Sequence, residues 1–296
     1  MNVDTGAARS FLATHGRILD RRRLDLLLGD STTQAGPVLA ALDGYRNPDG
    51  GYGWGLEPDL RSAESQPTGG MLAFEVMAEV APVTTPRAVE LCDWLDARTL
   101  ADGGLPLAFP VADPAGCAPW WANADPTTSS LQTTAQVAAT AHLVARHDAS
   151  VAGHPWLARA TAWCVDAIAR LDGRPFAYEL LFAVRFLDAL AEVDAAAVPL
   201  LDRLARYFPP DGVVPVPGGA DGEHLRPLDF SPRPGGPARR LFTDEVIAAE
   251  LDRLAQRQQP DGGWTVDFVA ASPAAALEWR GYATVSSLAV LIAART

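Results

Sequence analysis

Apolar residues recur at helical spacing along most of the chain, and the helical segments that they predict fall into two kinds. Segments such as 87–100 and 244–258 are amphipathic, with Leu, Val and Trp on one face and Arg, Asp and Glu on the other. Segments such as 69–78 and 129–141 are nearly free of charge, and a helix that is apolar all round is buried. The alternation predicts pairs of one outer and one inner helix. Further helices are predicted over 7–28, 37–45, 155–171, 176–193, 195–208 and from about residue 274 to 294, and Thr243 is predicted to cap the helix over 244–258.

Short turns of one composition end several of the amphipathic segments. Asp-Gly stands at Asp49, Asp102, Asp211 and Asp261, at spacings of 53, 109 and 50 residues. Asp followed by Gly turns the chain without the steric cost of a Cβ, and a neighbouring Pro cannot continue a helix. The doubled middle spacing predicts a degenerate turn near 172–175. A period near 50 residues with two helices in each unit is typical of helical repeats.

We expect these repeats to close into a ring, with charged helices outside and small-residue helices inside. Each inner helix would then contact two neighbours and its own outer partner. The Pro/Gly-rich stretch 209–237 replaces the helix expected there, so the hairpin at 209–242 is irregular. No shift in composition divides the chain, so residues 1–296 are predicted to form one domain. The sequence therefore predicts an all-α fold of about five to six helical hairpins.

Composition and charge exclude several classes of protein. The formal net charge is −12, with short basic clusters only at 21–23 and 239–240, whereas a duplex nucleic-acid binder presents a basic face. The three cysteines are widely spaced, which indicates a reducing compartment. Asp4, Arg9 and His15 occupy the place of a signal peptide's apolar run. No stretch approaches the roughly 18 apolar residues of a membrane span. We expect a soluble, cytoplasmic protein that binds no nucleic acid, with its oligomeric state open.

The last turn carries a resemblance to a known superfamily. Gln259-Pro260-Asp261-Gly262-Gly263-Trp264 resembles the Gln-Trp repeat of the terpene cyclases and protein prenyltransferases, and 47–54 is a partial match. The resemblance implies an α/α toroid with a central cavity for an isoprenoid or another hydrophobic small molecule. Within that superfamily, the segments 228–232, 238–242 and 277–281 are similar to a group of uncharacterised single-domain bacterial proteins, which brings no assigned activity.

The catalytic motifs of that superfamily are absent. The chain has no Asp-x-Asp-Asp, the acid motif of class II cyclases, and no Asp-Asp-x-x-Asp, which holds Mg²⁺ and diphosphate in class I synthases. Cofactors therefore stay unknown, and Mg²⁺ is expected only if the substrate is a diphosphate. Cys117 has no His nearby in sequence, so a plain thiol is favoured over a zinc ligand. His142 lies on an apolar segment, which favours a hydrogen-bonded core histidine.

The first candidate site is the loop after Trp54. Glu57 and Asp59 flank Pro58, which keeps the residue before it extended and spaces the two carboxylates. A loop that leads into an inner helix lies at the mouth of a ring. Either carboxylate could then act as an acid, a cation stabiliser or a metal ligand. The alternative is that Arg61 neutralises both carboxylates in an ion pair that braces the loop.

Trp54 and Arg61 of this loop are candidate substrate-binding residues, and two further clusters complete the set. In the first cluster, the aromatic faces of Trp120 and Trp121 could stabilise a cation or stack on a sugar ring. The alternative is that these side chains close one end of the ring. In the second cluster, the alternative to ligand binding is that Glu278 and Arg280 form a buried ion pair that fixes the start of the last inner helix. Tyr178, Glu179 and Asp229 are possible additions without independent support. The first cluster holds Trp120, Trp121, Asn123, Asp125 and Gln132, and the second holds Glu278, Trp279, Arg280 and Tyr282.

Three functions follow from these residues. The first is an enzyme on an isoprenoid or similar apolar substrate, cyclase-like or prenyl-transferring, with Glu57 and Asp59 as catalytic carboxylates. The second is a non-catalytic protein that holds a small molecule or a peptide. The third is a carbohydrate-active α/α barrel, which needs two carboxylates about 5–9.5 Å apart across the cavity. A dry aromatic cavity with one buried acid favours the isoprenoid enzyme. A filled or uncharged cavity favours the non-catalytic protein. A polar cavity with opposed carboxylates favours the carbohydrate-active barrel.

Overall fold

The structure, a computed structural model, describes residues 3–29 and 31–295, without the side chains of residues 31–33. The predicted all-α class is confirmed, since the described residues form fourteen α-helices, five short 3-10 helices and one pair of two-residue strands. The elements are α1 Thr5–His15, α2 Ile18–Leu28, α3 Ser31–Leu42, η1 Asp43–Tyr45, α4 Pro67–Glu79, α5 Pro86–Arg98, η2 Pro114–Gly116, α6 Pro119–Ala122, α7 Leu131–Ala145, α8 Ala149–Ala152, α9 Pro155–Ala169, α10 Ala177–Leu190, η3 Ala195–Ala197, α11 Val198–Leu204, η4 Ala205–Tyr207, β1 Val214–Pro215, β2 His224–Leu225, α12 Pro227–Phe230, η5 Pro237–Leu241, α13 Asp244–Gln256 and α14 Pro273–Ala293.

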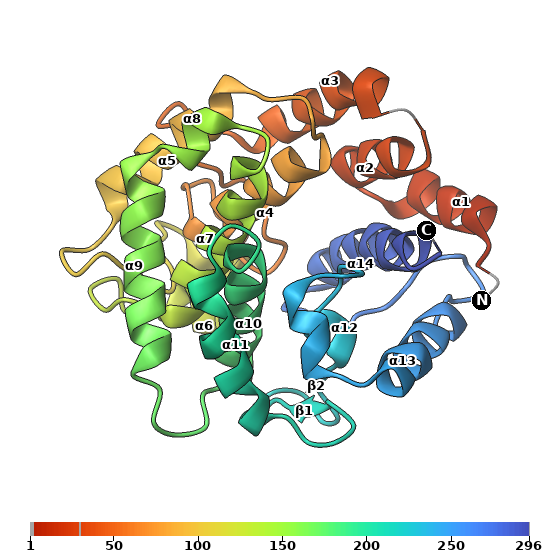
Figure 1. Cartoon of the computed structure of the whole chain (residues 1–296). Helices are drawn as coiled ribbons and strands as arrows, with labels where there is room; N and C mark the ends of the chain where they lie inside the picture. Colours follow the sequence, from red (N-terminus) through yellow and green to blue (C-terminus); the bar gives the residue numbers. More distant parts are fainter. Residues whose placement is uncertain (1–2, 30, 296) are drawn as a thin grey trace.

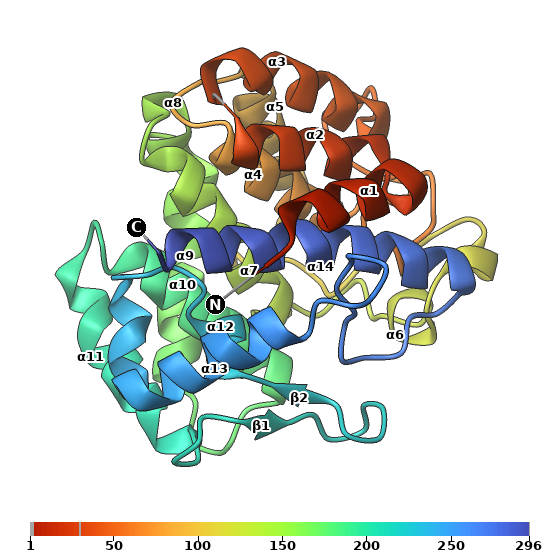
Figure 2. The same cartoon turned by 90° about the vertical axis from the view of Figure 1, so that its right-hand side faces the viewer.

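The helices contact one another in an order that returns to its start. Helix α2 packs on α3, α3 on α4, α4 on α7 and α7 on α10. From there α10 contacts α12, α12 contacts α13, and α13 contacts α14, which packs on α1 and α2. Figure 1 shows these helices arranged around a centre, and Figure 2 shows α14 running alongside α1. This order is what a ring of helices requires. Its division into five or six regular hairpins of an α/α toroid stays a prediction.

Three of the predicted turns share one geometry. At Asp49, Asp102 and Asp261 the carboxylate accepts the backbone N–H two residues later, at 3.0–3.1 Å. The glycine that follows each aspartate has a φ of +92° to +99°, which only glycine adopts at low cost. The fourth turn, at Asp211, has the same carboxylate bond but leads into β1 instead of a helix. These turns are therefore real repeats of one local structure.

The degenerate unit predicted near 172–175 connects α9 to α10 but lacks the Asp-Gly geometry of the other turns. Gly173 has no positive φ, and its carbonyl accepts a hydrogen bond from the Tyr207 hydroxyl at 2.6 Å. Arg174 also donates to the Tyr207 carbonyl. The segment is fixed by long-range bonds to Tyr207 at the end of η4, so the chain connects α9 to α10 without an Asp-Gly turn.

A tryptophan from the following outer helix fastens each of the first two turns. The Trp94 indole N–H of α5 donates to Asp49 at 2.9 Å, and that of Trp163 in α9 donates to Asp102 at 3.2 Å. The second glycine of each turn lies under the same ring. A Cβ on Gly51 would lie 2.6 Å from Trp94, and one on Gly104 would lie 2.8 Å from Trp163. Each turn thus joins two successive units.

The last turn joins the two ends of the chain. A Cβ on Gly262 would lie 2.2 Å from the Ala7 carbonyl, and one on Gly263 would lie 2.9 Å from the Phe11 ring. Both contacts come from α1, which takes the place that α5 and α9 have at the earlier turns. The Trp264 indole N–H donates to the Leu254 carbonyl at 2.8 Å, so this aromatic packs over the helix that has just ended. Helix α1 therefore acts as the outer helix that follows α13.

Several helix boundaries differ from those predicted. The single helix predicted over 7–28 is wrong, because Gly16 is extended and Arg17 turns to bond Asp20 and the Leu56 carbonyl. The helix predicted over 37–45 begins earlier, since Pro37 lies inside α3. The predicted helix over 195–208 is divided into η3, α11 and η4. The predicted cap at Thr243 is confirmed, because its hydroxyl accepts the Val246 N–H at 3.3 Å.

The irregular segment 209–242 has no long helix, as predicted. The β1–β2 hairpin, α12 and η5 occupy this part of the chain. Phe208, Phe230 and Phe242 contact one another, with ring centroids 4.8–6.3 Å apart. Fully buried Phe230 thus supplies the packing that the missing helix would have given.

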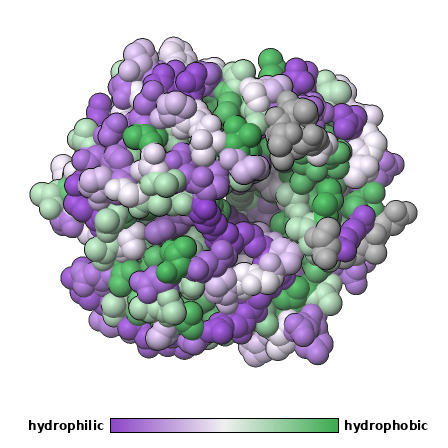
Figure 3. All heavy atoms as spheres, turned by 45° about the horizontal axis from the view of Figure 1, so that its top comes forward, coloured by the Kyte–Doolittle hydropathy of each residue, from purple (hydrophilic) through white to green (hydrophobic). Residues whose placement is uncertain are grey.

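One stripe of each inner helix faces the centre of the ring. Helix α7 lies between α4 and α10, and α9 covers its outer side. The half-buried positions of α10 are spaced at i, i+4 and i+7, at Tyr178, Phe182 and Arg185, and those of α4 include Met71 and Glu75. Because neighbouring helices cover the other faces, these stripes line the interior. Figure 3 shows a hollow near the centre of one face, with hydrophilic residues along part of its edge. These stripes therefore carry the charged side chains of Glu75 and Arg185 beside the apolar and aromatic ones of Met71, Tyr178 and Phe182.

Candidate functional site

The rim loop, residues 46–66, carries the two predicted catalytic carboxylates, and both are buried. Asp59 accepts two hydrogen bonds through its carboxylate, from the Ala271 N–H at 2.7 Å and from the Trp279 indole N–H at 2.8 Å. Its carbonyl accepts the Ala118 N–H at 2.7 Å. Asp59 therefore ties the rim loop to the segment before α6 and to the start of α14, and both of its carboxylate oxygens are occupied.

Glu57 is a buried carboxyl with few partners. One of its oxygens accepts the Asp59 N–H at 3.1 Å, and the other has no hydrogen-bond partner in residues 3–29 and 31–295. Burial raises the pKa of Glu57 to about 8. The Asp59 N–H and the positive charge of Arg17 oppose that shift, and the negative charges of Asp59 and Glu278 add to it. Glu57 thus holds a proton at neutral pH, which is the state that a general acid needs.

The predicted ion pair between Arg61 and the carboxylates of the rim loop is wrong. Arg61 pairs with Glu278 at 2.7 Å, because the start of α14 brings that residue beside the loop. The expected pairing of Glu278 with Arg280 is also wrong. Arg280 donates to both oxygens of Asp261 at 2.8 Å and lies over the Phe11 ring, where the ends of the chain meet. Glu57 is therefore not neutralised by either arginine.

An aromatic group extends from the rim loop toward the centre. The Trp279 ring contacts Phe268 and Tyr282 edge to face, with centroids 5.2 and 5.5 Å apart. The Tyr282 hydroxyl donates to Glu75 at 2.9 Å. The structure thus brings together two predicted clusters, that of Glu57, Asp59 and Arg61 and that of Glu278, Trp279 and Tyr282.

The other predicted ligand-binding residues lie apart from this group. Trp54 is 58% exposed and donates its indole N–H to Asn47 at 2.7 Å. Trp120 is exposed on α6, whereas the neighbouring Trp121 packs with Leu60 and other apolar side chains. Trp54 and Trp120 therefore lie on the outer surface, and Trp121 helps to close this end of the fold.

Asp125 and Gln132 have local positions. The Asp125 carboxylate accepts the hydroxyls of Thr127 and Thr128 and the Thr127 N–H, and these bonds lower its pKa. It shapes the turn before α7. Asn123 donates from its side chain to the Pro119 carbonyl. Gln132 is half-buried near the start of α7.

Four charged side chains at the ring interior, those of Arg23, Glu75, Glu79 and Arg185, were missed by the sequence analysis. Arg23 of α2 donates to Glu75 and Glu79 of α4 and lies 5.1 Å from the Tyr282 ring centroid. Burial raises the pKa of Tyr282, Glu75 adds to the rise, and Arg23 and Arg185 oppose it. The signal was present in the sequence, because Glu75 and Glu79 are the only charges on an otherwise apolar helix. We call Arg23, Glu75, Glu79, Arg185, Asp229 and Tyr282 the central polar cluster.

Asp229 and Arg185 form the other side of this cluster. The Arg185 Nε–H donates to the Asp229 carbonyl at 2.6 Å, and the Asp229 carboxylate accepts the Arg226 N–H at 2.7 Å. Burial raises the pKa of Asp229, which the Arg226 N–H and the charge of Arg185 oppose. The cluster therefore takes side chains from α2, α4, α10, α12 and α14.

The thiol and imidazole candidates do not form a reactive pair. The His142 ring lies 2.8 Å from the Thr161 hydroxyl, and burial, with the charge of Arg146, lowers its pKa to about 4. The predicted hydrogen-bonded core histidine is confirmed. Burial raises the pKa of the Cys117 thiol. In the part of the chain that the structure describes, no three His, Cys, Asp or Glu side chains are placed to hold a metal ion.

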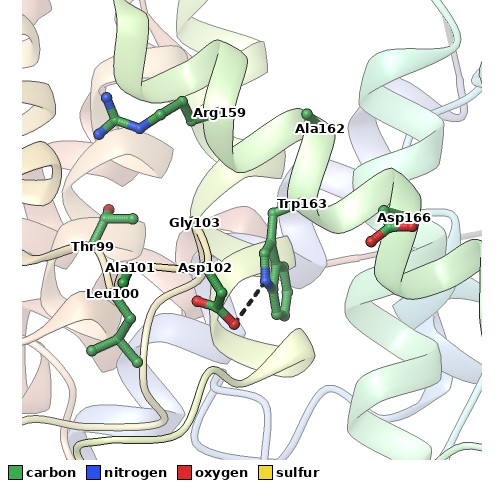
Figure 4. Close-up of a pocket in the computed structure, with 9 residues that line it drawn as sticks. All are labelled: Thr99, Leu100, Ala101, Asp102, Gly103, Arg159, Ala162, Trp163 and Asp166. Carbon is green, nitrogen blue, oxygen red and sulfur yellow. Dashed lines mark hydrogen bonds between the residues drawn. The ribbon is translucent and has the colours of Figure 1, made fainter.

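Two surface hollows lie at equivalent turns. One, of about 510 Å³, is lined by Asp102, Arg159 and Trp163, and Figure 4 shows the Trp163 indole directed at Asp102. The other, of about 560 Å³, lies beside Asp49 and Arg98. In both hollows the aspartate is already bonded to its own turn and to a tryptophan. They are products of the repeat, so the candidate site is the rim loop with the central polar cluster.

Comparison with known proteins adds information on the fold. No protein-family model matches the chain, and no curated protein matches it. None of the described helices is both long and apolar enough to cross a bilayer. The chain is similar to a solved structure of a protein from Actinoplanes, with a TM-score of 0.53 and 15% identity, over 99% of this chain and 89% of that one. At this identity the likeness extends to the fold alone.

Proposed function

We propose that the protein is an enzyme that binds a small organic molecule inside the helix ring and protonates it with Glu57. The observation that carries this proposal is a buried carboxyl with a pKa of about 8 and one oxygen without a protein partner. A carboxylic acid that stays protonated at neutral pH is what acid-initiated chemistry needs. Asp59 is then a positioning residue, because it orients the rim loop through Trp279.

The substrate class that the repeat resemblance favours is an isoprenoid. The edge-to-face group of Phe268, Trp279 and Tyr282 supports it, since aromatic faces stabilise a developing cation. The central polar cluster favours a polar group on the same molecule, because a pure hydrocarbon would give no partner to the Arg185 guanidinium, of which only the Nε–H is bonded among the described residues. We therefore propose an amphiphilic, isoprenoid-like substrate. Mg²⁺ would take part only if that polar group is a diphosphate.

The test is product formation from prenyl diphosphates and polyprenes, with and without Mg²⁺. We expect Glu57→Gln to lower the rate at least about 100-fold, because the side chain keeps its shape and loses the proton. The rate of the wild type should fall as the pH rises through about 8, as the carboxyl ionises. Glu64→Gln is a matched control, since that carboxylate lies in the same loop and accepts the Ala112 N–H.

Turnover that Glu57→Gln leaves unchanged would exclude Glu57 as the acid. Saturable binding without turnover of any substrate would instead favour the non-catalytic ligand-binding protein. The comparison with Glu57→Gln requires that the variant is folded, which its melting temperature establishes.

A second candidate function is glycoside hydrolysis, and it is favoured by one observation. Glu75 and Asp229 are carboxylates from α4 and α12, two elements that are not neighbours in the ring, and burial raises the pKa of Asp229 as an acid requires. Release of nitrophenol from a panel of aryl glycosides tests it. If the protein is a glycoside hydrolase, Glu75→Gln and Asp229→Asn should each abolish the release of nitrophenol. Glu57→Gln should not abolish it.

A further inference from the structure

We infer that Arg185 anchors the carboxylate group of a monocarboxylate ligand that has an apolar body. This inference rests on the proposed function in one respect, that a small molecule binds inside the ring. It does not depend on Glu57 or on any reaction. It assigns a chemical class to the polar part of the ligand and a residue to its recognition.

Arg185 is held in place while part of its guanidinium is free. Its Nε–H donates to the Asp229 carbonyl at 2.6 Å, which orients the group. Within residues 3–29 and 31–295 its two terminal nitrogens have no hydrogen-bond or ion-pair partner. The residue lies on the half-buried stripe of α10 that faces the interior, with Tyr178 and Phe182. A fixed guanidinium with free terminal nitrogens is suited to hold a carboxylate by two parallel hydrogen bonds.

A second unsatisfied donor lies on the neighbouring inner helix. Gln136 of α7 is 3% exposed, and its Nε2 has no hydrogen-bond partner among the described residues. Buried polar groups are nearly always bonded, so this amide points to a missing acceptor. On α7 the residue lies on the stripe with half-buried Gln132, Thr140 and Leu143, between the faces that pack on α4 and α10. Gln136 and Arg185 thus present donors from adjacent helices to one interior.

The charges around Arg185 favour an anion with one negative charge. Arg23 pairs with both Glu75 and Glu79, so that side of the cluster already has excess negative charge. The Asp229 carboxyl lies beside Arg185 on the other side. A diphosphate would place several negative charges close to these carboxylates, and among the described residues of the cluster Arg185 is the single arginine free to balance them. The resulting repulsion is unfavourable at short range. The apolar body of the ligand would contact Met71 and Phe182 on the same stripes.

Isothermal titration calorimetry with octanoate and benzoate as probes tests this assignment. We expect both carboxylates to bind the wild type, and their neutral amides, octanamide and benzamide, to bind at least about tenfold more weakly. Arg185→Gln should weaken carboxylate binding about 10- to 100-fold, since it removes a hydrogen-bonded charge. Arg185→Lys should retain part of the affinity. Arg170→Gln is the control, because that arginine is exposed on the far end of α9 and should have no effect.

Three results would overturn the inference. These are equal binding of acid and amide to the wild type, carboxylate affinity that Arg185→Gln does not change, and binding of inorganic pyrophosphate in place of the carboxylates. The first comparison uses only the wild type, so it holds even if Arg185→Gln does not fold. Glu57→Gln should bind octanoate normally. Loss of turnover in Glu57→Gln and loss of binding in Arg185→Gln are therefore separate results, and each proposal can fail without the other.

Discussion

Acidic side chains in the Asp-Gly turns and in the rim loop have opposite environments. Burial tends to raise the pKa of Asp102, but hydrogen bonds from Ser129, from the Gly104 N–H and from Trp163 lower it below its usual range. In the rim loop, Glu57 has one N–H donor, and burial raises its pKa to about 8. The turn aspartate is stabilised as an anion, while the rim carboxyl is stabilised as a neutral acid.

This difference separates structural acids from a candidate for chemistry. A carboxylate that accepts three hydrogen bonds from its own fold is held as an anion by those bonds and contributes to the stability of the turn. A buried carboxyl with a single partner costs stability once it is ionised, and such a cost persists where a function requires it. Within the rim loop itself, Asp59 follows the pattern of the turns, because it accepts two N–H donors. Glu57 is therefore the exception in its own loop.

The largest expected effect is on Glu57. Its folded pKa lies above that of the unfolded chain, so the native state binds more protons and its stability falls as the pH rises from about 4.5 to 8. Glu57→Gln removes this dependence. At pH 9 the variant should be more stable than the wild type by on the order of 4 kcal/mol, and at pH 4.5 the two should be equal. Urea unfolding across this pH range measures the difference.

Asp59→Asn is the matched comparison for that experiment. The amide cannot accept both N–H bonds, since its own NH₂ then faces a donor, so the variant should be less stable by about 2–4 kcal/mol at neutral pH. Two isosteric changes in one loop are thus expected to have opposite signs. If both destabilise the protein at pH 9, the two carboxylates have the same role and the distinction between them is wrong.

The next effect concerns the turns themselves. Gly50 and Gly262 have nearly equal φ values, +93° and +92°, but a Cβ would lie 3.1 Å from a carbonyl oxygen at Gly50 and 2.2 Å at Gly262. Both alanine variants incur the strain of a positive φ, about 1–2 kcal/mol. Gly262→Ala should incur at least about 2 kcal/mol more, because α1 must move away. Thermal unfolding of the two variants isolates the cost of closing the ring.

Equal losses in the two variants would contradict the tight contact between α1 and the last turn. Gly222→Ala is a further control, since Gly222 has a φ of +78° and nothing within 4 Å of its Cβ position. It should show the cost of the backbone conformation alone.

The same contrast explains which features the sequence could predict. Helices, Asp-Gly turns and the Thr243 cap depend on residues close in the chain, and most of these predictions are confirmed. The pairing of Arg61 with Glu278 joins residues 217 positions apart, and no local pattern indicates it. Trp94 was assigned only to an amphipathic face and Trp163 was given no role, although each tryptophan donates to the aspartate of an earlier turn. The polar interior was missed because Glu75 and Arg185 look like isolated charges in the sequence until the fold brings five helices together.

The smallest expected effect compares the two tryptophans. Trp94 is almost fully buried and donates to Asp49 at 2.9 Å, whereas Trp163 is partly exposed and donates to Asp102 at 3.2 Å. Phenylalanine keeps the ring and removes the N–H. We expect Trp94→Phe to cost about 2 kcal/mol and Trp163→Phe less than about 1 kcal/mol, because solvent replaces the second bond. A double-mutant cycle of Trp94→Phe with Asp49→Asn should give a coupling energy near 1 kcal/mol. A coupling of zero would mean that the tryptophan contributes only packing and that the aspartate stabilises its own turn alone.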